Sequence, residues 1–145
     1  MIVSNFLVGM EMKIEEHIQY WMDCAADDLD TAEKLFAVEK FDWCLFLGHL
    51  VLEKVLKAHY VQDNDNQMPP RIHNLLKLAK KTRLPLDQEL VIFLDEVSDF
   101  NLEVRYPEYK KEFKRKCTGE FCQTKFSKIK EHYQWLKSQI KFETS

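Results

Sequence analysis

The segment from Phe41 to Val61, FDWCLFLGHLVLEKVLKAHYV, constrains the possible folds of this chain more than any other segment. Its apolar residues would cover most of the circumference of a helix rather than a single stripe. A helix of this kind must pack against neighbours on several sides. We therefore predict a helix from about Asp42 to Val61 at the centre of a helical bundle.

The same segment carries a line of ionisable side chains. His49, Glu53 and Lys57 are spaced at i, i+4 and i+8, with Lys54 and Tyr60 at the margins, so they share one helix face. An unpaired charge in an apolar core is strongly unfavourable, so we expect this line to face water, a groove or another subunit. It is either a solvated helix edge with an ordinary Glu53–Lys57 pair, or the floor of a ligand-binding cleft.

Apolar residues that recur every three or four positions predict the other helices. Their expected ranges are about Met12–Val38, His73–Lys81, Asp87–Asn101 and Glu120–Lys141. The Asn, Asp and Pro residues of Gln62–Pro70 indicate a loop. Pro107 and the loss of apolar periodicity predict that Arg105–Gly119 is irregular. The fold class is therefore all-α, an antiparallel up-and-down bundle of four long helices plus a short fifth helix.

The length of 145 residues fits one domain, which we place at residues 13–142 after an N-terminal tail of residues 1–12. The composition, 46% hydrophobic and 31% charged with only 3 Gly and 4 Pro, is ordinary for a soluble protein and favours long helices. No apolar run is long enough to cross a membrane, so we expect no membrane partner.

The net charge of −3 is unevenly distributed. Residues 1–60 hold 11 acidic against 5 basic side chains, whereas residues 71–145 hold 16 Lys and Arg against 11 acids. A basic C-terminal half is compatible with a nucleic-acid partner, with self-association of opposite faces, or with an ordinary mixed surface.

The four cysteines are expected to be reduced thiols in a cytoplasmic protein. Cys24, Cys44, Cys117 and Cys122 form no CxxC motif and are too sparse for a disulfide scaffold. We expect them to be buried as small apolar side chains, and we predict no metal site and no cofactor. The sequence also offers no complete set of nucleophile and base, so we assign no catalytic residue.

Four motifs in one order resemble the HEPN family, named for higher eukaryotes and prokaryotes nucleotide-binding. These are DLDTAEKLF, the Phe-rich helix that ends in EKVLKAHYV, the short HNLLKLAKK and the turn NLEVRYPEY, together covering about Tyr20–Tyr109. The resemblance implies a helical bundle that usually dimerises, is often encoded beside a minimal nucleotidyltransferase, and handles nucleotides or RNA. Several branches of the family are metal-independent endoribonucleases, including toxins of toxin–antitoxin pairs.

The ribonuclease branches share an Arg followed four to six positions later by a His. Arg105 stands where that Arg would, but RYPEYKKEFKRK contains no His, and the next one is His132. We therefore predict an accessory module that binds a nucleotide, RNA or a partner nucleotidyltransferase. The predicted ligand-binding residues are His49, Glu53, Lys57, His73 and Arg105.

Two other functions remain open. One is an endoribonuclease toxin in which Arg105 stabilises charge and a displaced His is the base. The other is a structural dimerisation module whose polar line forms the interface. Arg105 would pair with a phosphate or with an acid across the bundle, and His73 with Asn74 would form a helix cap and core contacts or contact a ligand.

A cluster of cations follows Arg105 and carries one aromatic residue, Phe113, among its lysines. This cluster is a candidate for contacts to the RNA backbone, although lysines in a mobile loop would give the same pattern. Its members are Lys110, Lys111, Lys114, Arg115 and Lys116.

Overall fold

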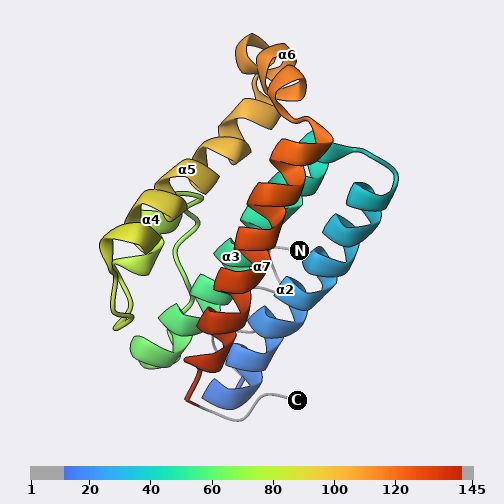
Figure 1. Cartoon of the computed structure of the whole chain (residues 1–145). Coiled ribbons are helices and arrows are strands. Elements are labelled where there is room, and N and C mark those ends of the chain that lie inside the picture. The colour runs from blue at the N-terminus through green and yellow to red at the C-terminus, as the bar shows by residue number, and fades with distance from the viewer. Residues whose placement is uncertain (1–11, 142–145) are drawn as a thin grey trace.

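The computed structural model describes residues 12–141, and within this range the chain forms six helices and no strand (Figure 1). The helices are α2 (Ile14–Ala37), α3 (Phe41–Asp63), α4 (Leu75–Ala79), α5 (Gln88–Arg105), α6 (Pro107–Lys116) and α7 (Gly119–Ser138). The prediction of an all-α bundle is confirmed. The predicted tail, apart from Met12, and residue 142 lie outside the described residues.

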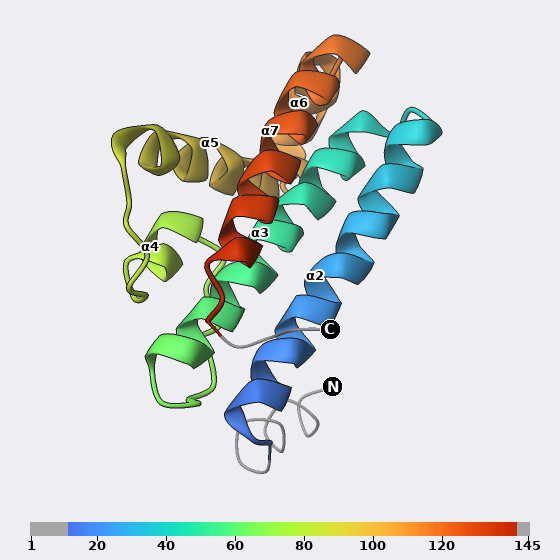
Figure 2. The ribbon, with the colours of Figure 1, turned by 60° about the horizontal axis from the view of Figure 1, so that its bottom comes forward.

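Helix α3 is the centre of the bundle, as its all-round apolar surface predicts. It contacts each of the other five helices of the described range. In Figures 1 and 2, α2 and α7 run alongside it, and α4 and α5 lie on the side away from α2. Its fully buried apolar residues are Cys44, Leu45, Val51, Leu52, Val55, Leu56, Ala58 and Val61.

One glycine sets the close approach of α7 to α3. A Cβ atom at Gly48 would lie 2.7 Å from Cδ1 of Ile129, which is closer than two carbon atoms can pack. A side chain at Gly48 would therefore displace the end of Ile129, so this glycine leaves room for the α7 residue that packs beside His49.

Three helices begin at side-chain caps that the sequence supplies. Asp87 accepts from the backbone N–H of Leu90 at the start of α5, and Thr118 does the same for α7. Asn74 accepts from the N–H of Lys77 at the start of α4, which confirms its predicted role as a cap. Each cap satisfies one N–H group that the first helical turn leaves unpaired.

The prediction that Arg105–Gly119 is irregular is wrong for most of its length. Residues Pro107–Lys116 form α6, with Pro107 in its first turn, where the missing N–H group has no cost. Only Phe113 of this helix is buried, and its ring lies 5.4 Å from that of Phe100 on α5. A helix with one buried side chain has no apolar stripe, so periodicity does not reveal it.

No helix within residues 12–141 is both long enough and apolar enough to span a lipid bilayer.

Phe113→Ala tests whether one buried ring holds α6 to the bundle. Removal of a buried phenyl ring costs about 3–5 kcal/mol, so the free energy of unfolding in urea should fall by about that amount. Tyr109→Ala on the same helix, where the side chain is exposed, is the matched control and should change it by less than about 0.5 kcal/mol. Equal effects of the two substitutions would contradict this account of α6.

Candidate functional site

The three ionisable side chains on one face of α3 are buried inside the bundle. His49 is fully buried, Glu53 is 2% exposed and Lys57 is 8% exposed. The prediction that this line faces water, a groove or another subunit is therefore wrong. It is neither a solvated helix edge nor a surface that a second subunit could cover, because the chain itself buries all three side chains. Each of the three also has a partner within the chain.

Glu53 is the best-connected of the three. Its Oε2 accepts from Nζ of Lys57 at 3.0 Å, and its Oε1 accepts from Nδ1 of His73 at 2.9 Å. The Lys57 ammonium also lies 5.2 Å from the ring centre of Trp21 on α2. Burial acts to raise the pKa of Glu53, but Lys57 and His73 outweigh it and hold that pKa below its usual value.

His49 joins α3 to the segment before α4. Its Nε2 lies 2.8 Å from the backbone oxygen of His73 and must carry a hydrogen to donate to it. Burial lowers the pKa of His49, so the ring is neutral and its Nδ1 is an acceptor. Nδ2 of Asn101 lies 3.5 Å from this Nδ1, a long contact in which the amide donates.

Asn101 connects His49 to Arg105 on α5. It is 3% exposed, and its Oδ1 accepts from Nη2 of Arg105 at 2.6 Å while its backbone oxygen accepts from Nε at 3.1 Å. The sequence reasoning missed Asn101. A signal was present, because Asn101 continues the apolar stripe of α5 through Leu94 and Val97, where a polar residue needs a buried partner.

These contacts join all five predicted site residues into one network, which we call the polar chain. It runs from Arg105 through Asn101 and His49 to the backbone of His73, and from the His73 ring to Glu53 and Lys57. Two members reach solvent: Arg105 is exposed, and the His73 side chain is 54% exposed. His73 thus contacts the buried Glu53 and His49, as one of its two open interpretations expected, while its ring also faces solvent.

The two exposed members keep donors or acceptors for a ligand. Arg105 uses Nε and one N–H of Nη2 within the protein, and a guanidinium has five N–H groups, so the rest can contact an anion. His73 uses Nδ1 within the protein, which leaves Nε2 for a ligand.

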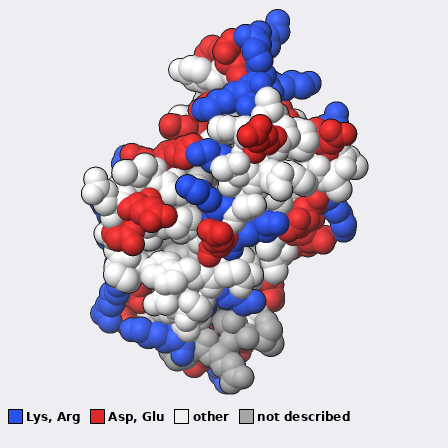
Figure 3. Space-filling view, in the orientation of Figure 1, with Lys and Arg blue, Asp and Glu red and all other residues white. Residues whose placement is uncertain are grey.

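The predicted cations of residues 110–116 all lie on α6 and are exposed. Arg115 pairs with Glu112 at 2.6 Å, and Lys116 lies 5.4 Å from the ring centre of Phe121. Lys110, Lys111 and Lys114 form no ion pair with any acid of residues 12–141. Figure 3 shows Lys and Arg atoms gathered at the α6 end of the molecule.

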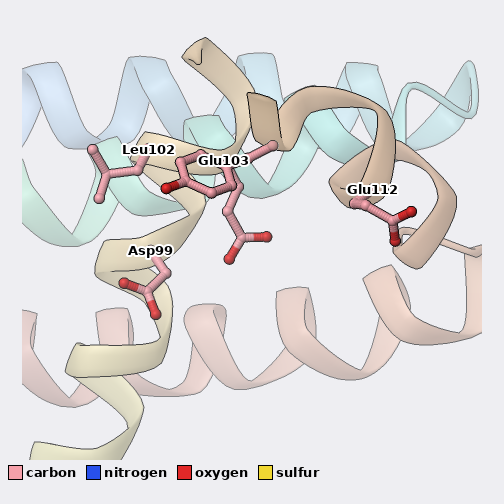
Figure 4. A pocket seen from close by; sticks show the side chains of 5 residues that line it. Asp99, Leu102, Glu103 and Glu112 are labelled. Atoms are coloured by element: carbon pink, nitrogen blue, oxygen red, sulfur yellow. The ribbon is translucent and has the colours of Figure 1, made fainter. Parts of the chain in front are cut away.

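A cavity of about 290 Å³ lies between α5 and α6, and no residue of the polar chain lines it. It is lined by Asp99, Leu102, Glu103, Tyr109 and Glu112, as Figure 4 shows. Burial and the nearby carboxylates of Asp99 and Glu96 raise the pKa of Glu103, against the effect of Lys116. Three carboxylates make this cavity unsuited to a phosphate.

Cys44, Cys117 and Cys122 are buried, as expected, and all four cysteines are free thiols. The prediction of burial is wrong for Cys24, which is partly exposed. The pKa of the Cys44 thiol is raised, mainly by its hydrogen bond with Cys122 and secondly by burial. Burial raises the pKa of Cys117 to about 12. These two groups are therefore uncharged and unreactive near neutral pH.

Glu53→Gln tests the buried ion pair. It leaves the Lys57 ammonium buried without a counter-charge, which costs about 3–5 kcal/mol of unfolding free energy. Asp30→Asn is the matched control, since Asp30 pairs with Lys34 at the same i, i+4 spacing, at 2.8 Å against 3.0 Å for Glu53 and Lys57, but on the surface. The control should change stability by less than about 1 kcal/mol in the same denaturation experiment at pH 7. Similar losses of unfolding free energy in both variants would refute the claim that burial makes the Glu53–Lys57 pair more important than a surface pair.

The burial of His49 predicts that the free energy of unfolding of the protein falls in acid. Its pKa is lowered in the fold, so below pH 6.5 the unfolded chain binds a proton that the folded chain does not. The stability that the neutral ring contributes is present above pH 6.5 and is lost as the pH falls, by about 1.4 kcal/mol per pH unit. Denaturation between pH 7 and 5 should therefore show a shallower loss for His49→Asn than for the wild-type chain. Parallel losses would contradict this assignment.

Comparisons with known proteins agree with the helical architecture. The crystal structure of TT1696 from Thermus thermophilus is similar, with a TM-score of 0.72 at 17% identity over 85% of this chain and 98% of that one. At this identity the similarity is one of fold. No curated protein matches the chain.

The sequence model of the HEPN domain matches residues 18–139, which include every helix that contributes to the polar chain. The match confirms the resemblance noted in the sequence, and it indicates a function related to nucleotides or RNA at the level of the family. The chain therefore belongs to the HEPN domain family.

Proposed function

We propose that this protein is an accessory module that binds RNA or a nucleotide by its phosphate, with Arg105 and His73 contacting the ligand. His49, Glu53 and Lys57 would act from within the bundle by holding these two groups. The observation that carries the proposal is the polar chain, which connects an exposed guanidinium and an exposed imidazole through buried, hydrogen-bonded residues.

The chemistry of the two exposed groups supports a phosphate ligand. A guanidinium binds phosphate oxygens with paired N–H groups, and Asn101 holds the Arg105 guanidinium through two hydrogen bonds from its Nε and Nη2. His73 is fixed in orientation by the Glu53 carboxylate at 2.9 Å. Both groups are thus ordered before a ligand binds, which reduces the entropy lost on binding.

The charges on α6 support a ligand longer than one nucleotide. This helix follows Arg105 directly, and Pro107–Lys116 contain five cations against Glu108 and Glu112. Lysines next to a phosphate site extend the positive surface along which a nucleic-acid backbone can lie.

The proposal includes partners and a location. Membership of the HEPN family supports a homodimer, since HEPN domains commonly dimerise, and the resemblance supports a minimal nucleotidyltransferase as the partner of a toxin–antitoxin type pair. Free cysteines support the cytoplasm, where thiols stay reduced.

One observation favours a second candidate, a metal-independent endoribonuclease. The pair of Glu53 and His73 resembles the carboxylate–histidine pairs that orient a general base, because the carboxylate accepts from Nδ1 and leaves Nε2 to take a proton. In this role, Nε2 would remove the proton of a ribose 2′-hydroxyl as its oxygen attacks the adjacent phosphorus and the 5′-oxygen leaves. Arg105 would stabilise the charge on the phosphate oxygens.

Arg105→Ala tests the binding proposal. The dissociation constant for a fluorescein-labelled unstructured 12-nucleotide RNA, measured by anisotropy, should rise at least about tenfold, which is 1.4 kcal/mol. Arg83→Ala is the matched control, because Arg83 is exposed in the connection between α4 and α5 at the opposite end of α3. An unchanged constant in Arg105→Ala would remove Arg105 from the site.

Incubation of the same RNA with the protein in excess chelator separates the two candidates. Cleavage that is lost in both His73→Gln and Arg105→Ala would establish the endoribonuclease. Binding without cleavage would support the accessory module. Cleavage that survives both substitutions would show that neither residue is its cause.

A further inference from the structure

We propose that the surface formed by α6 and the start of α3 binds single-stranded RNA, with Trp43 stacking on a base and Lys110 contacting a neighbouring phosphate. This inference rests on the proposed function, and it adds the form of the ligand and the residue that contacts its base. Trp43 is not among the residues assigned to the polar chain.

Trp43 is placed as a platform for a flat ring. It lies in the first turn of α3, and its side chain is 37% exposed although α3 is otherwise the most buried helix of the bundle. The Phe46 ring packs edge-on against it at 5.7 Å and 82°, which holds the indole in one orientation. A large aromatic ring that is both fixed and accessible is the feature on which unpaired bases stack.

A cation from another helix lies on this platform. Nζ of Lys110 on α6 is 5.8 Å from the ring centre of Trp43, and Lys110 has no acidic partner among residues 12–141. The lysine is therefore free to contact a phosphate while it remains beside the ring. Cation and aromatic ring together offer both contacts that a nucleotide needs, one to its phosphate and one to its base.

A second pair of cation and aromatic ring lies one helical turn before Lys110. Its cation is Arg105, a member of the polar chain. The Arg105 guanidinium lies 5.6 Å from the ring centre of Tyr106, whose side chain is 43% exposed. The backbone N–H of Lys110 donates to the oxygen of Tyr106, so the two residues are one turn apart. Two pairs of cation and aromatic ring thus extend from Arg105 to Trp43, along the course that a strand bound at Arg105 would take.

The charges on α6 show which side of that helix the strand would use. Tyr109 and Glu112 line the acidic cavity with Asp99 and Glu103 (Figure 4), and this side repels phosphates. Lys110 reaches Trp43 instead. The strand would therefore lie on the side of α6 that contacts α3.

Stacking also determines the form of the ligand. In a duplex the faces of the bases are already stacked on their neighbours, so an indole on the protein surface can reach only unpaired bases. A duplex would use the lysines of α6 alone.

The experiment compares two tryptophans of equal exposure. Trp43 and Trp135 are both 37% exposed, but Trp135 lies near the end of α7. With the unstructured 12-nucleotide RNA as probe, Trp43→Ala should raise the dissociation constant roughly 5- to 150-fold, the effect of one lost base stack, whereas Trp135→Ala should leave it unchanged. Trp43→Phe should keep most of the affinity, and it serves as the second variant if Trp43→Ala does not fold.

Two further readouts do not depend on the alanine variant. Titration with the RNA should quench tryptophan fluorescence in the wild-type protein, and Trp43→Phe should lose most of that quenching. A blunt duplex of the same sequence should compete at least about tenfold less well than the single strand.

The outcomes separate this inference from the proposed function. Weaker binding in Arg105→Ala together with unchanged binding in both Trp43 variants would retain the proposed function and overturn the stacking surface. Equal competition by duplex and single strand would overturn it too. Absence of any binding by the wild-type protein would overturn both.

Discussion

The structure depends on a carboxylate that has almost no access to water. Glu53 lies in the middle of the most apolar helix, and its charge is tolerated only because Lys57 and His73 both donate to it. His73 precedes α4, so the segment that leads into α4 must reach α3 for the carboxylate to be satisfied. The hydrogen bond from His49 to the His73 backbone holds that segment at a second point. One buried acid therefore fixes the position of an exposed imidazole.

The bundle contains two contrasting kinds of helix. Helix α3 is packed on every side and contributes residues that hold others in place, whereas α6 is exposed along its whole length except at Phe113. Arg105 and Tyr106 lie where α5 passes into α6, between the rigid core and the charged helix. A ligand at this junction would contact both residues supported by the polar chain and the exposed cations of α6.

Sequence alone predicted the parts of the fold that depend on local pattern. The central position of α3, the loop after it and the Asn74 and Asp87 positions at helix starts follow from apolar coverage and capping chemistry. Helix α6 could not be found by periodicity, because only Phe113 is buried. Its signals were of another kind: Pro107 in the first turn, Glu108 beside it and three cations in the last turn, a charge order that suits the helix dipole.

The residues of the candidate site could be predicted from the sequence, but their surroundings could not. Spacing placed His49, Glu53 and Lys57 on one face, but it gave no information on what covers that face. Their partners come from distant parts of the chain, His73 from 20 residues beyond Glu53 and Asn101 from 52 residues beyond His49. Without them, the line of ionisable groups had to be assigned to water, a groove or another subunit. The family match adds the class of function, and the geometry adds which groups face solvent.

The side-chain amide of Asn101 gives the polar chain a direction. Its nitrogen faces His49 and its oxygen faces Arg105, so hydrogen atoms point from the guanidinium toward the His73 carbonyl throughout. A second proton on His49 would turn Nδ1 from an acceptor into a donor, and the amide could satisfy it only by rotating its oxygen inward. The nitrogen would then face the guanidinium, donor against donor. The charge state of a ring that never meets solvent would thus decide whether an arginine at the surface keeps one or both of its hydrogen bonds to Asn101.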